Sequence, residues 1–193
     1  MLKVIPILVF CLVCPILAMA DRTVVFDLSY SEGSATYSAS TKSPMTDLQS
    51  QTQNSIGTLG VSVFNIDGPH WLLGGGIDYS WVSFAGTHET ISSKLWSYSV
   101  KYKYFFGDSV KKGFYVMPQA GFASGDGTDT ISQEKYTLKG VGISVGTEVG
   151  YSYPIKDTVS VHVGLSGMAT WLSDFEYPYT IYSVPMLKIG ISY

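Results

Sequence analysis

The side chains of this chain that could carry out acid–base chemistry fall on alternate positions of β-like segments. Three acids, three lysines and one histidine share the less bulky face of these segments: Asp27, Asp78, Lys101, Lys103, Glu148, His162 and Lys188. Acids beside lysines and an imidazole suit general acid–base catalysis or a path for ions or protons. The same set also suits buried ion pairs, because an unpaired charge in a narrow interior is very costly. We interpret the set as a structural polar network, with an ion or proton path as the alternative.

A hydrolase would need a nucleophile next to His162. Ser166 lies on the same face but four residues away, which is about 13 Å along an extended strand. That distance is too long for proton transfer, and Glu176 alone does not complete a catalytic set. We therefore predict that the protein has no catalytic residues and is not an enzyme.

Metal, cofactor and nucleic-acid binding find little support in the sequence. Residues 125–129 resemble a calcium loop but lack the later bidentate glutamate, and His70, His88 and Glu89 are scattered. Only 14% of the residues are charged, the net charge is −3, and no basic run occurs. We predict no metal site, no cofactor and no nucleic-acid partner.

The first twenty residues have the features of a signal peptide. Lys3 precedes an apolar run, and Ala18 and Ala20 form a small-x-small cleavage site. A retained anchor helix is the alternative, although the run is short for a membrane span. Both cysteines fall within this segment, so the expected mature domain, residues 21–193, contains no disulfide.

The mature chain contains eight segments in which apolar and polar residues alternate with period two. They lie at about residues 24–30, 55–65, 71–81, 96–106, 114–122, 141–151, 159–171 and 181–193. Longer connections at residues 31–54, 85–93 and 124–136 and one of intermediate length at 173–180 alternate with short ones at 67–70, 107–113 and 154–158. This pattern predicts an all-β fold: a single eight-stranded antiparallel up-and-down transmembrane β-barrel.

The two faces of these segments differ strongly in volume. An eight-stranded barrel has room inside only for filling side chains, so the bulky face must point outward into lipid. Trp71 and Trp81 are ten residues apart on that face, about 25 Å along the barrel axis, as two aromatic girdles would be. The predicted girdle residues are Trp71, Trp81, Trp96, Phe106, Trp171 and Tyr193. Ile181 is also expected to face lipid, while Pro118 and Pro185 each indicate a bulge or a strand end.

Taken together, the cleavage site at residues 18–20, the alternating strands and the C-terminal residues 187–193 resemble the small outer-membrane barrels of the OmpA transmembrane-domain and OmpX class. The resemblance implies export to a Gram-negative outer membrane, among its lipids and lipopolysaccharide. It also implies recognition of the terminal Tyr193 by the barrel-assembly machinery. Lipid A deacylases among outer-membrane barrels have a histidine and a serine two residues apart, whereas this chain has His162 followed by Gly164.

The leading functional hypothesis is a structural, adhesive or surface-interaction role of the extracellular loops, with a host or surface molecule as a possible ligand. A narrow porin-like channel and a lipid A-modifying enzyme are the two alternatives.

Overall fold

The computed structural model describes residues 24–39, 53–85, 89–107, 109–131, 134–173 and 179–193. The predicted signal peptide with Ala18 and Ala20 lies outside the described residues, and so do His88 and Glu176. Within the described ranges no helix is long and apolar enough to cross a membrane.

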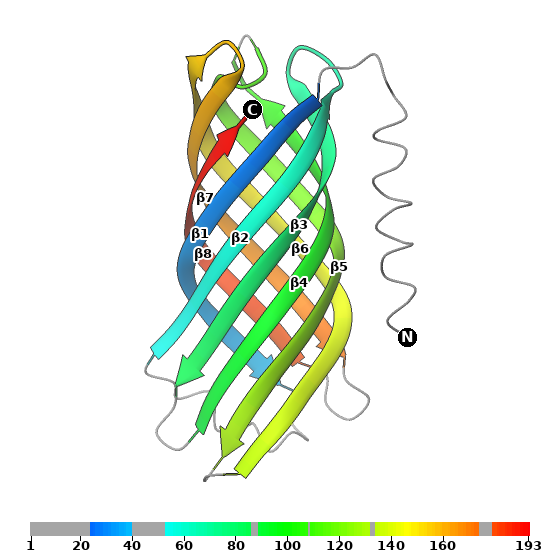
Figure 1. Ribbon diagram of the computed structural model, residues 1–193, viewed down its shortest axis with the longest axis vertical. Coiled ribbons are helices and arrows are strands. Elements are labelled where there is room, and N and C mark those ends of the chain that lie inside the picture. Colours follow the sequence, from blue (N-terminus) through cyan, green and yellow to red (C-terminus); the bar gives the residue numbers. More distant parts are fainter. Residues whose placement is uncertain (1–23, 40–52, 86–88, 108, 132–133, 174–178) are drawn as a thin grey trace.

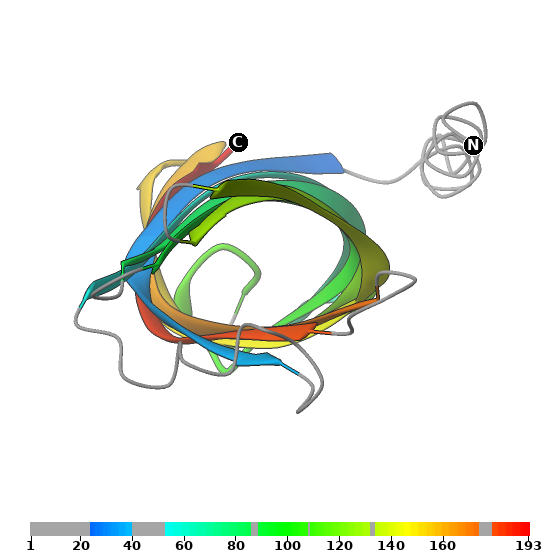
Figure 2. The same ribbon diagram turned by 90° about the horizontal axis from the view of Figure 1, so that it is seen from below.

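The described residues form eight antiparallel strands that close into one barrel, each strand pairing with its neighbours in sequence and β1 with β8 (Figure 1, Figure 2). The strands are β1 (Val24–Ala39), β2 (Gln53–Ile66), β3 (Trp71–Ala85), β4 (Glu89–Phe105), β5 (Gly113–Ile131), β6 (Glu134–Lys156), β7 (Val159–Ser173) and β8 (Tyr179–Ser192). The predicted fold class is confirmed. We call the end where β1 begins and β8 finishes the terminal end, and the opposite end the distal end.

Tight turns join the strands at the terminal end. Gly68, Lys111 and Gly113 have positive φ angles of 152°, 74° and 100°. A glycine accepts such angles without strain, which explains why two of these three turn positions carry one. Residues 109–112 bend across the barrel opening rather than away from it (Figure 2).

The strands are longer than predicted at the distal end. They contain 14–23 residues, whereas about ten are enough to cross a bilayer. The predicted loop at residues 124–136 is wrong: β5 and β6 are paired there as far as Ile131 and Glu134. The backbone pairing of β5 with β6 therefore continues past the end of the predicted alternation.

The outer surface carries a continuous belt of exposed apolar side chains, including Phe26, Val61, Val100, Ile143 and Ile189. A monomeric soluble protein rarely exposes an apolar surface of this extent, whereas a lipid-facing barrel requires it.

One outward-facing assignment is wrong. Ile181 is only 3% exposed and points inward, because β8 contains one extra residue between Ser183 and Met186 relative to both neighbouring strands. A bulge of this kind reverses the alternation on one side of it. It lies at Pro185, one of the two predicted irregularities. At Pro118 the register of β5 with β4 and β6 does not shift.

Two apolar clusters inside the barrel are not predicted by the sequence analysis. The terminal-end cluster consists of Val25, Phe64, Leu72, Phe105, Tyr115 and Met117. The distal-end cluster consists of Ala35, Ile56, Val82, Phe84, Leu95, Ala123, Met168, Leu172, Ile181 and Met186. The seven predicted network residues lie between these two clusters.

Candidate functional site

The interior brings all seven predicted network residues into buried positions. Lys101 on β4 and Asp78 on β3 form one ion pair, with Nζ 2.8 Å from Oδ2. Glycines on the neighbouring strands leave space for this pair. A Cβ at Gly76 would lie 2.9 Å from the Lys101 ammonium, and one at Gly60 would lie 2.4 Å from Oδ1 of Asp78. The glycines therefore allow two long charged side chains to fit inside a small barrel.

A second ion pair joins Glu148 on β6 to Lys188 on β8, with Oε2 2.6 Å from Nζ. The hydroxyl group of Tyr115 on β5 donates a hydrogen bond to the other carboxylate oxygen of Glu148. Lys103 lies over the ring of Tyr115, with its ammonium 4.1 Å from the ring centroid. Tyr115 is thus a member of this network that sequence reasoning missed. Its inward position on β5, opposite Phe114, was the available signal.

Asp27 on β1 is the centre of a third group. It accepts a 2.8 Å hydrogen bond from the Ser192 hydroxyl, and Nζ of Lys103 and Nε2 of His162 each lie 3.6 Å from Oδ2. Ser192 was also missed, because only the pairing of β7 with β8 brings it near His162.

Ser192, His162 and Asp27 include the residue types of a catalytic triad, but their geometry is different. The Ser192 hydroxyl donates directly to Asp27 and lies 3.5 Å from Nδ1 of His162. In a triad the serine donates to the histidine, and the acid orients the far side of the ring. His162 is 1% exposed and Ser192 is also buried, so the arrangement acts as an internal hydrogen-bonded group. The hydroxyl group of Ser166, the serine considered from sequence, forms no hydrogen bond with a described residue.

Apolar side chains separate this charged layer from both ends of the barrel. At the terminal end Val110 packs against the terminal-end cluster, and Ser152 donates a 2.8 Å hydrogen bond to the carbonyl of Lys111. These contacts hold the β4–β5 turn across the opening. The charged layer is therefore enclosed, and its paired acids and lysines have the features of a packed polar core.

Residues 39–179 match a sequence family described as "Protein of unknown function (DUF3575)". The chain belongs to the DUF3575 family. No curated protein matches it.

Several solved structures are similar in fold to this DUF3575 chain. It is similar to Ail, the attachment invasion locus protein of Yersinia pestis, at 7% identity and a TM-score of 0.53, covering 88% of this chain and 97% of Ail. A structure of Ail with the heparin analogue sucrose octasulfate gives 7% identity, a TM-score of 0.52 and coverages of 88% and 99%. Neisserial surface protein A gives 13% identity, a TM-score of 0.49 and coverages of 89% and 98%. At 7% identity the likeness to Ail concerns the fold, the eight-stranded barrel.

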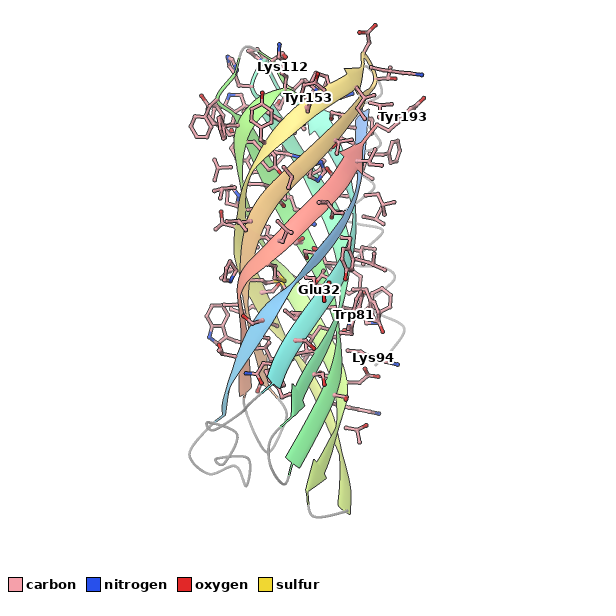
Figure 3. The ribbon with its side chains drawn as sticks, turned by 90° about the vertical axis from the view of Figure 1, so that its left-hand side faces the viewer. Glu32, Trp81, Lys94, Lys112, Tyr153 and Tyr193 are labelled. Atoms are coloured by element: carbon pink, nitrogen blue, oxygen red, sulfur yellow. The ribbon has the colours of Figure 1, made fainter. Side chains whose placement is uncertain are left out.

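Outward-facing aromatic residues of the DUF3575 barrel lie near both ends of the apolar belt. At the terminal end the ring centroid of Tyr104 lies 4.2 Å from that of Trp71 and 5.0 Å from that of Phe106. Tyr193 is exposed at the same end, where its backbone pairs with Phe26. Towards the distal end Trp96 lies 4.7 Å from the ring of Tyr79, and Trp81 lies 6.1 Å from it. Figure 3 shows Trp81 and Tyr193 at these two different heights. Trp171 is exposed on β7.

Among the described residues, no three or more histidine, cysteine, aspartate or glutamate side chains come together as a metal site would require. Asp126, in the segment that resembled a calcium loop, instead belongs to strand β5 and pairs with Lys94 and Lys139 in the sheet register.

Proposed function

We propose that this protein is an outer-membrane surface protein, in which a closed barrel serves as the anchor and the distal ends of the strands carry a binding role. The observation that carries the proposal is the filled interior. Ion pairs and two apolar clusters occupy the space inside the described barrel, so the surfaces available to a ligand lie outside it.

The outer-membrane location is supported by the apolar belt, the aromatic residues near both its edges and the tight turns at the terminal end. Outer-membrane barrels have their short turns in the periplasm and their longer connections outside. The terminal end is accordingly periplasmic and the distal end extracellular. Tyr193 pairs with Phe26 through two backbone hydrogen bonds, and its exposed ring is available to the barrel-assembly machinery. Residues 1–20 direct export.

The distal end has the extra surface that a binding role needs. Among the described residues, β6 pairs with β7 from Val141 onward, and residues 134–140 pair with β5. Figure 1 shows the β5–β6 hairpin reaching furthest at this end. Ail, which shares the fold, is named as an attachment protein. By this reasoning the hairpin contacts a host-cell or other external surface.

Adhesion of bacteria that display the protein tests this role. In the test variant, residues 129–136 are replaced by Asn-Gly, which closes the hairpin directly after the paired Thr128 and Thr137. A second variant keeps the length of the hairpin but carries the same eight residues in scrambled order. We expect full-length protein to increase adhesion to cultured cells and both variants to lose the increase. Adhesion that is unchanged by both variants would refute a binding role for this hairpin.

Folding of each variant is checked by comparing the gel mobility of boiled and unboiled samples in detergent. A folded barrel migrates differently before and after boiling. Absence of a shift for the unaltered protein would refute membrane-barrel assembly itself.

Absence of enzymatic activity is part of the same proposal. The burial of His162 and Ser192 supports it, because lipid A cannot reach them from the membrane. Mass spectra of lipid A from cells with and without the gene are expected to be identical. A mass change of an acyl chain or a phosphate group would overturn this part of the proposal.

A further inference from the structure

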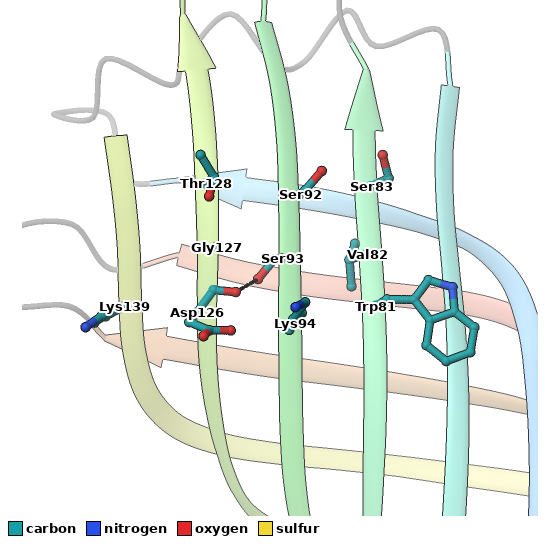
Figure 4. A pocket seen from close by; sticks show the side chains of 10 residues that line it. All are labelled: Trp81, Val82, Ser83, Ser92, Ser93, Lys94, Asp126, Gly127, Thr128 and Lys139. Atoms are coloured by element: carbon teal, nitrogen blue, oxygen red, sulfur yellow. Dashed lines mark hydrogen bonds between the residues drawn. The ribbon is translucent and has the colours of Figure 1, made fainter. Parts of the chain in front are cut away.

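A groove of about 400 Å³ lies on the outer wall of strands β3 to β6, at the distal edge of the apolar belt. Its centre is a row of cross-strand neighbours. Trp81 pairs with Lys94, Lys94 with Asp126, and Asp126 with Lys139. Figure 4 shows these four side chains on four adjacent strands. All four are exposed, and the exposed hydroxyl groups of Ser92 and Thr128 lie one step further toward the distal end.

The row crosses the level at which lipid meets water. Neighbouring strands are about 4.8 Å apart and tilted by about 40°, so each step along the row moves about 3 Å along the barrel axis. Figure 3 places Lys94 nearer the distal end than Trp81. Asp126 and Lys139 therefore lie about 6 Å and 9 Å beyond Trp81. The headgroup layer of a bilayer leaflet is about 5–7 Å thick, so the row runs from the aromatic residues through that layer.

The charge of the groove is positive at this level. Two lysines flank one aspartate, and neither lysine forms an ion pair with a described residue. In the sheet register Lys94 and Lys139 are two strands apart, about 10 Å. That spacing lets both ammonium groups contact one phosphorylated sugar headgroup. Trp81 supplies an apolar surface beside them, and its ring covers Gly57, where a Cβ would lie 2.3 Å from the ring.

The backbone of this region is held in place from inside the barrel. The buried Ser93 donates a 3.2 Å hydrogen bond to the carbonyl of Asp126, which Figure 4 shows as a dashed line. The β4–β5 pairing continues on both sides of this bond. The groove is therefore part of a rigid sheet, and a ligand would bind without first ordering a loop.

We propose that this groove binds the phosphorylated sugar headgroup of an outer-leaflet glycolipid, with Lys94 and Lys139 on the phosphate groups. The position within the headgroup layer is what favours a membrane lipid over a soluble anionic sugar. The inference rests on the orientation given under Proposed function. Its test is independent of the adhesion assay, because it uses purified protein and lipid.

The experiment measures equilibrium binding of diphosphoryl lipid A to the folded protein in neutral detergent micelles. The double variant K94Q/K139Q is compared with K112Q/K156Q, which removes two exposed lysines at the terminal end. A lysine near an anionic membrane surface strengthens binding about fivefold, so we expect about 30-fold weaker binding for K94Q/K139Q. The control pair should bind within about twofold of the unaltered protein. Equal losses in both pairs, or no loss in either, would overturn the proposal.

Two further arms identify the ligand. Asp126→Asn removes the one negative charge of the row and should tighten binding, so weaker binding by this variant would contradict the charge argument. Inorganic phosphate and sucrose octasulfate should each fail to displace lipid A at millimolar concentration. Displacement by either would assign the groove to a soluble anion and refute the membrane lipid as its occupant.

Discussion

Replacement of Lys188 by methionine is expected to destabilise the barrel strongly, although the two side chains have similar volumes. Glu148 is 2% exposed and Lys188 is 8% exposed, with 2.6 Å between their charged atoms. Loss of one partner leaves the other charge buried without compensation, which typically costs about 3–5 kcal/mol. Because Glu148 keeps the hydrogen bond from Tyr115, we expect the lower value, about 3 kcal/mol.

Two matched variants distinguish the effect of losing a charge from the effect of changing the side-chain shape. Glu148→Gln should also cost about 3 kcal/mol, since it leaves the Lys188 ammonium buried and unpaired. The double variant K188M/E148Q contains neither charge and retains a partner for Tyr115. It should therefore lose less than about 1.5 kcal/mol, far below the sum of the two single variants.

Reversible unfolding in urea, followed by tryptophan fluorescence in detergent or lipid vesicles, measures these free energies. Lys112→Met at the exposed terminal end is the control and should change stability by less than about 0.5 kcal/mol. If the double variant loses as much as the two single variants added together, the two residues are not energetically coupled. The interpretation of the interior as a paired network would then be wrong.

Three further predictions concern the bulge, the girdle and the interior. Ile181→Ala should lower the free energy of unfolding by about 3 kcal/mol because Ile181 is buried inside the barrel, whereas Ile189→Ala on the lipid face should lower it by about 1 kcal/mol. Equal losses of stability in urea unfolding would contradict the bulge at Pro185. Trp81→Ala should cost about 2 kcal/mol in the same titration, since it removes the ring that covers Gly57; an unchanged midpoint would show that the ring contributes nothing to stability. Planar-bilayer recording of pure folded protein should show no conductance steps, because apolar clusters lie on both sides of the charged layer, and regular steps would support the channel alternative.

The fold could be predicted from sequence because lipid imposes a rule that is visible in every strand. Each backbone group must be paired, and each outward side chain must be apolar, so period-two alternation identifies both the strands and their faces. The same alternation assigns the charged residues Asp78 and Lys101 to the inward face. In the structure Nζ of Lys101 lies 2.8 Å from Oδ2 of Asp78.

The parts that could not be predicted are those where this rule does not apply. Beyond the apolar belt water replaces lipid, and the pairing of Thr128 with Thr137 leaves no alternation to detect. At Pro185 one extra residue reverses the alternation, so Ile181 was placed on the wrong face. Ser192 lies far from Asp27 in sequence, and only the pairing of β8 with β1 brings the two together, whereas Tyr115 meets Glu148 across the β5–β6 pairing.

The lysines of strand β4 show how the same alternation separates structural residues from candidate ligand-binding residues. Lys101 and Lys103 occupy inward positions, and each lies within 4 Å of a buried acid. Lys94 is seven residues before Lys101, an odd separation, so it faces outward, where a lone lysine would be costly in the lipid belt. It lies instead at the distal edge of that belt, beside Trp81. An outward lysine at that height is stable only if water or an anionic headgroup surrounds it, and this requirement places Lys94 at the boundary of the membrane.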